Sequence, residues 1–354
     1  MGNRFPTGMR RITIGDVAAR AGVSKGTVSK YFGGNGYYMS EETRSRIAAA
    51  VAELDFEPNA IAQGLVHGRT HTIGVIVASV VNPLYAELVD GVDEVLGAEG
   101  FTLIMSSSEG SAEKESLAVR SMRQRQVDGI IMASVTMVGS KVQDLVTSGV
   151  NVVLASRHLP STSVDTVIAD NLRGARMAVE HLAEHGHTRI GHIAGPPEVA
   201  PFIERRAAYE EVLQDRHLPS GDALVVQAAS SRREDAAEAM AALMSGTDRP
   251  TAVFVPSDGM ALGALQACDQ LGLDVPRDVA VVGFDNVWVS RMPGIRLTTV
   301  DSSARALGAR AASILLTRIQ SRWDGKTGAP PQLDVLPARL VLGSTCGCPP
   351  ELWE

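Results

Sequence analysis

Histidines gather in one short stretch of this sequence, and imidazole is a common zinc ligand. The group comprises His181, His185, His187 and His192. Its first two members have the i, i+4 spacing with which a helix turns two imidazoles toward one ion. A metalloprotease helix would carry Glu directly after the first His, whereas this sequence has Leu182 there. We therefore expect a structural role for these histidines, and a metal-dependent hydrolase is the alternative that bound metal would reveal.

Cysteine is the second residue type with metal or redox chemistry, and the sequence contains three. Cys346 and Cys348 flank a glycine near the C-terminus, while Cys268 is far from both along the chain. So few thiols predict no disulfide framework and are typical of a reducing cytoplasm. Two ligands in a stretch rich in Gly and Pro are too few for a metal site, so residues 346–354 are expected to form an incidental tail.

Patterns of other catalytic or cofactor-binding sites do not occur. The sequence has no G-x-S-x-G nucleophile elbow, no phosphate-binding P-loop and no dinucleotide fingerprint. We therefore expect neither an enzymatic activity nor a cofactor.

Binding chemistry is predicted instead near the N-terminus, where three short helices are expected. Residues 14–21 and 25–32 have helical apolar patterns, with Gly22 as the break and Ser24 as the N-cap of the second helix. A third helix follows its N-cap Ser40 and supplies apolar side chains for a small core: Ile47, Val51 and Leu54. Two short helices joined by such a turn form a helix-turn-helix, whose second helix enters the major groove of DNA.

The same stretch resembles the N-terminus of the lactose-repressor (LacI) family of bacterial transcription regulators. The residues that match the pattern T-x-x-D-V-A-x-x-A-G-V-S-x-x-T-V-S-R are Thr13, Asp16, Val17, Ala18, Ala21, Gly22, Val23, Ser24, Thr27, Val28 and Ser29. Lys30 replaces the usual final Arg. The resemblance continues through residues 40–44, Phe56, 58–59 and 62–65 and resumes in the C-terminal part, so it covers nearly the whole chain.

By this resemblance the second helix is the recognition helix, and its N-terminal side chains face base edges. The residues expected to contact DNA are Ser24, Lys25, Gly26, Thr27, Ser29 and Lys30. Lysine can donate to O6 and N7 of guanine, whereas Gly26 is unexpected because it offers no side chain. The alternative is that Lys25 and Lys30 are ordinary solvated residues of a helix surface.

Residues 58–69 resemble the hinge helix and linker of the family. In the family this helix folds only against DNA, pairs with its twin from a second subunit and wedges a leucine into the minor groove. Leu65 matches that leucine, and Asn59 and Ala62 match positions that contact the minor groove and its backbone. The alternative is an ordinary linker, which Gly64 favours because glycine is a poor helix former.

Length and charge are compatible with a DNA-binding protein of several domains. The 354 residues suggest two or three domains. The net charge of −7 is unevenly distributed: residues 1–70 have nine Lys and Arg against six Asp and Glu, and the remainder has 24 against 34. The basic part coincides with the predicted head. Residues 1–11 are expected to be a disordered lead-in without a secretory signal, and no segment is apolar enough to cross a bilayer, which predicts a cytoplasmic protein.

Strand and helix patterns alternate from residue 70 onward, as in parallel sheets covered on both faces. Strands are expected at 71–78, 102–105, 129–133, 152–155, 189–194, 224–227, 252–255, 279–284, 298–300 and 333–341. Helices are expected at 84–99, 113–125, 141–147, 172–185, 203–214, 233–244, 260–271 and 304–321. The resemblance implies a bilobed, periplasmic-binding-protein-like α/β body after an all-α head.

The expected domain boundaries follow from these elements. The helix-turn-helix domain spans 12–57 and the hinge 58–69, and the bilobed effector-binding and dimerisation domain spans 70–345. Its first lobe is expected at about 70–170 with 301–328, and its second at about 171–300 with 329–345. The incidental tail then covers 346–354.

Ligands of open α/β sheets bind beyond the carboxyl ends of the strands, which here converge between the lobes. By their match to family motifs, the expected effector-binding residues are Tyr85, Arg205, Ser257 and Asp285. An arginine fork and a carboxylate suit neighbouring hydroxyl groups. Arg206 is the alternative to Arg205. Each residue could also have a purely structural role: Tyr85 could lie in the core, Arg205 could form a surface ion pair, and Asp285 could close a turn. Asp258 is expected to cap the helix at 260–271, and Phe202 and Trp288 are candidate pocket walls.

These features together predict a sequence-specific DNA-binding transcriptional regulator, and a repressor in particular. The expected partners are a near-palindromic DNA operator, a second copy of the chain in a homodimer, and a small effector such as a sugar or polyol in the cleft. A solute-binding protein that feeds a transporter is the main alternative. It would share the body, but it would not need residues 13–66 and would normally carry an export signal.

Overall fold

The computed structural model describes residues 12–32, 38–57, 68–134, 139–159, 163–246, 248–326 and 328–353. The chain divides into two compact units, residues 1–70 and residues 71–354. We call the first unit the head and the second the body, and describe each by itself. The predicted lead-in at 1–11 and the predicted hinge contacts Asn59, Ala62 and Leu65 lie outside the described residues.

The head contains the three predicted helices α1 (Ile14–Ala21), α2 (Lys25–Phe32) and α3 (Glu41–Glu53). Gly22 ends α1 in the left-handed conformation, with a φ of 64°, which glycine adopts at little cost. The Ser24 hydroxyl accepts the Thr27 amide at 3.1 Å, so its predicted capping role is confirmed. Ser40 caps α3 in the same way. The small core contains side chains from all three helices: Val17, Ala18, Ala21, Val28, Ile47 and Ala50.

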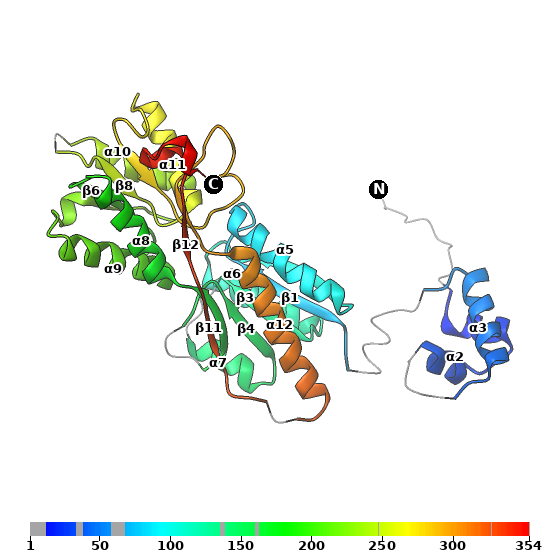
Figure 1. Ribbon diagram of the computed structural model, residues 1–354. Helices are drawn as coiled ribbons and strands as arrows, with labels where there is room; N and C mark the ends of the chain where they lie inside the picture. Colours follow the sequence, from blue (N-terminus) through cyan, green and yellow to red (C-terminus); the bar gives the residue numbers. More distant parts are fainter. Residues whose placement is uncertain are drawn as a thin grey trace, which may run out of the picture. The chain divides into compact units, whose positions relative to one another are not determined.

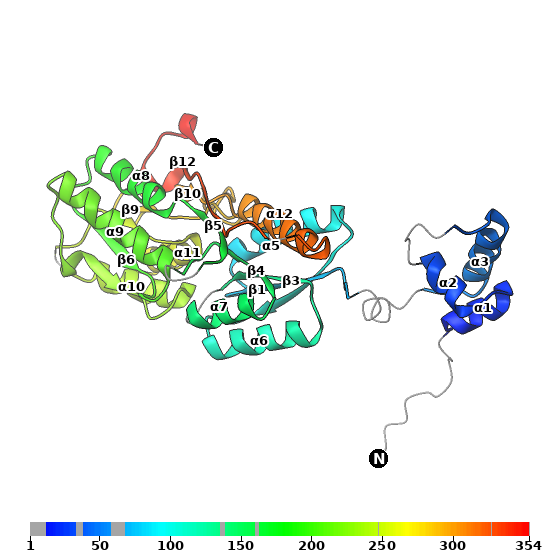
Figure 2. The same ribbon diagram turned by 90° about the horizontal axis from the view of Figure 1, so that it is seen from below.

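The first lobe of the body is built on a six-stranded parallel sheet of order β11-β5-β4-β3-β1-β2. The strands are β1 (Thr72–Val77), β2 (Thr102–Ser107), β3 (Gly129–Ala133), β4 (Asn151–Ala155), β5 (Asp165–Ala169) and β11 (Leu333–Leu336). The helices are α5 (Pro83–Ala98), α6 (Ala112–Gln124), α7 (Gly139–Thr147) and α12 (Ala304–Trp323). Helices α5 and α12 cover one face of the sheet, and α6 and α7 cover the other (Figures 1 and 2).

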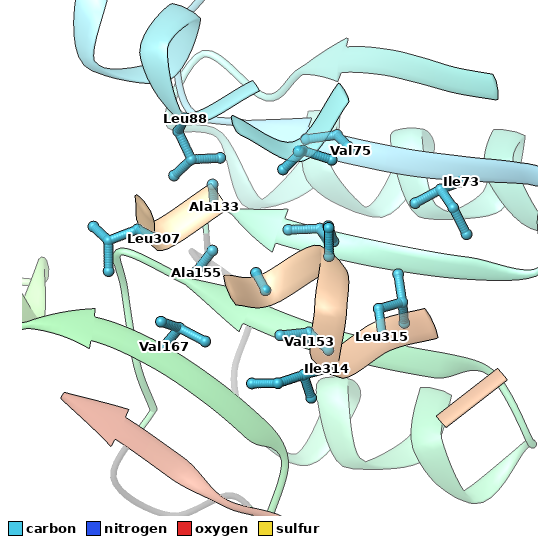
Figure 3. Packing of buried hydrophobic residues seen from close by; sticks show 14 of the residues in the cluster. Ile73, Val75, Leu88, Ala133, Val153, Ala155, Val167, Leu307, Ile314 and Leu315 are labelled. Carbon is cyan, nitrogen blue, oxygen red and sulfur yellow. The ribbon is translucent and has the colours of Figure 1, made fainter. Parts of the chain in front are cut away.

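The core between α5, α12 and the sheet consists of buried side chains that are aliphatic except for Tyr85, and part of this core is drawn in Figure 3. Leu307 and Leu315 of α12, which packs on β3, β4 and β5, contribute to it, and Leu88 contributes from α5. Strands with a helix on each face bury both sets of alternating side chains, so they are apolar throughout instead of alternating. This explains why β3 is buried at every position.

The second lobe has a four-stranded parallel sheet of order β7-β6-β8-β9. Its strands are β6 (Ile190–Ala194), β7 (Val225–Gln227), β8 (Ala252–Phe254) and β9 (Ala280–Val282), and a short 3-10 turn, Asp222–Leu224, precedes β7. Helices α8 (Asn171–Glu184) and α9 (Ala200–Asp215) pack on one face, and α10 (Arg233–Met244) and α11 (Asp258–Gln270) on the other. The predicted α/β architecture with parallel sheets is thereby confirmed.

Two parts of the body differ from the sequence-based expectation. Strand β5 was not predicted at all, although it lies inside the first sheet between β4 and β11. The single strand predicted at 333–341 is two strands: β11 pairs with β5, whereas β12 (Arg339–Val341) pairs antiparallel with β10 (Thr299–Asp301). Pro337 stands between them and lacks the amide hydrogen that would continue the ladder. Residues 333–336 therefore belong to the first lobe and not to the second.

The C-terminal segment is part of the second lobe and not an incidental tail. Cys346 and Cys348 are only 3% and 5% exposed and pack in the same apolar cluster as residues of α8 and α9. Two short 3-10 turns, Ser344–Cys346 and Pro350–Leu352, shape the segment. It lies on the second lobe in both views (Figures 1 and 2). Among the described helices none is both long and apolar enough to span a membrane.

Candidate DNA-binding surface and effector cleft

Helix α2 turns its predicted contact residues away from the core of the head. Val28 is its buried residue, whereas Lys25, Gly26, Ser29 and Lys30 are exposed. Positions i, i+1, i+4 and i+5 of a helix lie on one face, so these four residues form a single outward surface. A helix with one apolar stripe and one exposed polar face has the form required to enter the major groove.

Ser24 and Thr27 have a structural use at the start of α2. Their hydroxyl groups lie 2.8 Å apart, and Ser24 also caps the helix. The Lys25 side chain lies over α1, because a Cβ placed on Gly15 would be 2.9 Å from Lys25 Cε. Lys25 would therefore have to turn outward to reach a base edge, whereas a phosphate contact near the N-terminus of α2 requires less rearrangement.

The body places unpartnered polar groups at the carboxyl ends of its strands. Among the described residues, five buried side-chain atoms there have no hydrogen-bond partner: Ser108 Oγ after β2, Ser134 Oγ after β3, His158 Nδ1 after β4, and Asp285 Oδ2 and Asn286 Oδ1 after β9. A buried polar atom without a partner costs about 1–3 kcal/mol. Their shared location indicates a site that a polar ligand would complete.

Arg205 forms the centre of this site in the second lobe. It lies on α9, is 5% exposed, and donates from Nε and Nη2 to Asn171 Oδ1 at 3.1 and 2.9 Å. Its Nη1 is 3.5 Å from Asp285 Oδ1, and its guanidinium carbon lies 3.6 Å from the centre of the Phe284 ring. Arg206 instead pairs with Glu210 on the exposed side of α9. The geometry therefore selects Arg205 over Arg206.

Asp285 is held in a conformation that non-glycine residues rarely adopt. Its φ is 122°, and its Oδ2 has no hydrogen-bond partner within the part of the chain that the structure describes. Burial raises the pKa of this carboxyl to about 8, although the neighbouring Arg205 acts in the opposite direction. Strained backbone and a perturbed carboxyl at a strand end are features of binding sites.

Asp258 has a different role from the predicted one. Ser257 is the residue that caps α11, because its hydroxyl accepts the Met260 amide at 3.4 Å. The Asp258 carboxylate instead accepts from Ser290 Oγ at 2.7 Å and from the Val287 amide at 3.0 Å. Burial raises the pKa of Asp258 to about 6. Asp258 thus orders the loop that follows Asp285, which the capping interpretation did not foresee.

The first lobe reaches the same site through Tyr85 and the loop after β4. Tyr85 is buried, and its hydroxyl is 3.5 Å from Arg157 Nη2. The neighbouring His158 approaches Glu204 of α9, with Nε2 and Oε1 separated by 3.4 Å. Glu204 accepts from Asn171 Nδ2 at 2.7 Å, which connects this lobe to the residues around Arg205.

Two of the four predicted effector residues, Arg205 and Asp285, thus belong to one polar network that reaches the first lobe at His158. Tyr85 contacts Arg157, the chain neighbour of His158. Ser257, the fourth predicted residue, is also buried, but its hydroxyl caps α11. Sequence reasoning missed Arg157 and three members of the network: His158, Asn171 and Glu204. Asn171 follows β5, so recognition of that strand would have placed it at a strand end.

The two candidate wall residues lie outside this network. Trp288 is 52% exposed, and its backbone amide donates to Glu87 Oε1 of the first lobe at 2.7 Å. Phe202 packs on the backbone of Gly195, where a Cβ would meet its ring.

The predicted histidine pair and the two C-terminal cysteines, by contrast, meet in space. The ligand atoms of His181, His185, Cys346 and Cys348 all lie within 4.8 Å of one another. His187 and His192 have other neighbours: Nδ1 of His187 bonds Thr251 Oγ1, and His192 is buried against Tyr209 and Phe254. Burial lowers the pKa of His192 to about 4.

Most of the chain is similar in sequence to bacterial regulatory proteins. The model described as bacterial regulatory proteins, lacI family, matches residues 13–59, and a periplasmic binding protein-like domain matches residues 179–346. Catabolite control protein A of Priestia megaterium is 33% identical over 305 residues, which cover 86% of this chain and 91% of that protein. The HTH-type transcriptional repressor PurR of Salmonella arizonae is 34% identical over 322 residues, covering 88% and 92%.

Solved structures give the same result. The lac repressor dimer bound to operator and the anti-inducer ONPF superposes with a TM-score of 0.82 at 26% identity, covering 95% of this chain and 99% of that one. A complex of the transcriptional regulator CelR with cellobiose has a TM-score of 0.70 at 30% identity, with 95% and 100% coverage.

Proposed function

This chain belongs to the lacI family of bacterial regulatory proteins, and we propose that it represses transcription as a homodimer on a near-palindromic operator. It is a DNA-binding transcriptional regulator and not an enzyme. The observation that carries the proposal is the outward surface of α2, where Lys25, Gly26, Ser29 and Lys30 are exposed together on a folded helix-turn-helix. A regulator of this kind acts on the chromosome, so we place it in the cytoplasm.

The effector is proposed to be a sugar or polyol that binds between the lobes. Arg205 donates and Asp285 accepts, and the unpartnered serine hydroxyl groups after β2 and β3 can do either. Such a mixture of donors and acceptors suits a ligand with several hydroxyl groups better than a purely anionic or apolar one. The cellobiose in the CelR complex supports this ligand class.

Control of DNA binding is proposed to result from a change in lobe closure. The contact between His158 of the first lobe and Glu204 of the second connects the lobes directly at the site. A ligand that binds one closure state better than the other shifts the population toward that state. The shift would change how the predicted hinge segments of two subunits approach each other, and hence whether both heads engage the operator.

The test is selection of bound duplexes from a random pool by the wild-type protein, Lys25→Ala and Lys30→Ala. We expect the wild type to enrich one palindrome. A lysine that contacts a base should change the enriched sequence, whereas one that contacts phosphate should weaken all sequences and lower the salt slope by about 1. Lys114→Ala, which changes an exposed lysine of α6 in the body, is the matched control. The proposal is wrong if both head variants behave like this control.

The selected duplex then serves as a probe for effectors. Titration of mono- and disaccharides should change its affinity for the wild type. In Asp285→Ala the response should disappear while affinity without sugar is retained. An unchanged response in Asp285→Ala would contradict the proposed site but not the regulatory function.

A further inference from the structure

Two incomplete sets of metal ligands from distant parts of the chain meet at the C-terminal end of α8. His181 lies in the last turn of α8 and His185 is the C-cap of this helix, while Cys346 and Cys348 follow the last strand. From sequence alone each pair has too few ligands for a site, but the fold brings all four together. We propose that these four side chains bind one zinc ion that fastens the C-terminal segment, residues 344–353, to α8.

The distances agree with tetrahedral coordination. Zinc binds thiolate sulfur at about 2.3 Å and imidazole nitrogen at about 2.0–2.1 Å, so neighbouring sulfur and nitrogen ligands of a tetrahedral site lie about 3.5 Å apart. Cys348 Sγ is 3.6 Å from His181 Nε2 and 3.3 Å from His185 Nε2. The remaining pairs lie within 4.8 Å. Only small side-chain movements are needed to place all four atoms on one ion.

The backbone between the cysteines is shaped to direct both sulfurs to one point. Cys-x-Cys is a shorter spacing than the C-x2–4-C of most structural zinc sites. Gly347 lies in the left-handed region with a φ of 88°, where a side chain would be strained. This turn lets two cysteines so close in sequence contribute to the same cluster.

The surroundings would hold the thiolates in place. Thr298 Oγ1 donates to Cys346 Sγ at 3.0 Å, which fixes the position of this sulfur. The Trp353 indole donates to the Cys348 carbonyl at 2.8 Å and orders the residues that follow. The end of α8 contributes the partial negative charge of a helix C-terminus, which stabilises a cation.

The ligand set also indicates what the ion does. Four protein ligands complete a tetrahedral zinc ion and leave no position for water or substrate, which is the arrangement of a structural and not a catalytic site. The site would stabilise the second lobe independently of DNA and of the effector, and it is compatible with a protein that is not an enzyme.

The test uses the reduced full-length protein, stripped with a chelator and titrated with Co²⁺. We expect one equivalent to bind with the strong visible bands of tetrahedral Co²⁺ and a near-ultraviolet charge-transfer band from thiolate ligands. Zn²⁺ should displace it and bleach both features. Zn²⁺ should also raise the melting temperature of the stripped protein.

Two matched pairs of variants assign the ligands. His185 is exposed, so His185→Gln should fold normally and bind the metal at least about a hundredfold more weakly, whereas His187→Gln should bind like the wild type. Replacement of Cys346 and Cys348 by Ser should remove the charge-transfer band, whereas Cys268→Ala, in α11, should keep it. If the double cysteine variant does not fold, the histidine pair alone decides the assignment.

Three results would overturn the proposal. The first is a stripped protein that binds no Co²⁺ at micromolar concentration with its thiols reduced. The second is a weak octahedral spectrum, which would place the metal elsewhere. The third is equal affinity in His185→Gln and His187→Gln.

Discussion

Asp285 and Arg205 show how single residues prepare the cleft for a ligand. Burial disfavours the charge of each, so the Arg205 pKa is lowered and the Asp285 pKa is raised even though the two face each other. The separation of 3.5 Å is long for a charge-assisted bond. Ligand hydroxyl groups that donate to Asp285 would favour its ionised form and fill the missing hydrogen bond.

Asp285→Asn is expected to remove one pH dependence from the stability of the body. The folded-state pKa of about 8 lies above the value of an unfolded aspartate, so the folded wild type binds an extra proton between about pH 4 and pH 8. Its stability should therefore fall as pH rises through this window, by at most about 1.4 kcal/mol per pH unit relative to the variant.

The measurement is urea unfolding of both proteins between pH 5 and pH 8, followed by tryptophan fluorescence. All three tryptophans, at positions 288, 323 and 353, lie in the body, so the signal reports that unit alone. A constant difference between the two proteins over this range would show that Arg205 keeps Asp285 ionised throughout.

Helix pairs in both lobes pack through glycines at close approach. A Cβ on Gly91 of α5 would collide with the backbone of Arg305 in α12, and one on Gly308 of α12 would collide with that of Leu88. In the second lobe, Gly263 of α11 has the same relation to Arg233 of α10. Backbone atoms cannot turn away as side chains do. Each helix crossing therefore requires a glycine, which has no Cβ, at the point of closest approach.

Gly308→Ala is therefore expected to destabilise the body by about 1–3 kcal/mol through overpacking. Gly97→Ala, in α5, is the matched control, because a Cβ there meets no atom within 4 Å. It should be neutral or stabilise by up to about 1 kcal/mol, since alanine favours helix. The measurement is the free energy of unfolding of both variants in urea. Equal stabilities would mean that α5 and α12 separate at small cost.

At the scale of the whole molecule, DNA binding and ligand binding are assigned to different units. The head has its own core, and the body has separate clusters on both faces of two sheets. The segment at 58–69, which includes Leu65, connects the two units along the chain, and we expect it to carry the signal between them. This assignment makes the two binding activities separable by mutation.

Leu65→Ala is expected to weaken operator binding at least about tenfold, because unstacking a base step requires the apolar wedge. Its affinity for the effector should not change, since the cleft lies in the other unit. Fluorescence anisotropy with labelled operator and calorimetric titration of the effector provide the two values. A variant that binds and bends the operator like the wild type would show that the segment is only a linker.

Local sequence signals were sufficient to predict most helices and strands of this protein and to recognise its family. Ser24, Ser40 and Gly22 define the head helices because caps act within one turn of the chain. Long apolar runs define most strands, and motif matches located Arg205, which lies on α9, and Asp285, which follows β9. Those two residues lie together in the structure, while their role in effector binding stays a prediction.

Tertiary structure decided what depends on neighbours far away in the sequence. The short strand β5 exists because β4 and β11 provide its partners, and Pro337 divides one apolar stretch between two sheets. Asp258 orders a loop instead of capping a helix because Ser290 is folded against it. The histidine and cysteine pairs, each too small by itself, became a four-ligand cluster only when the C-terminal segment packed on α8. Residue spacing along the chain cannot predict such contacts, because they result from packing between segments that are distant in sequence.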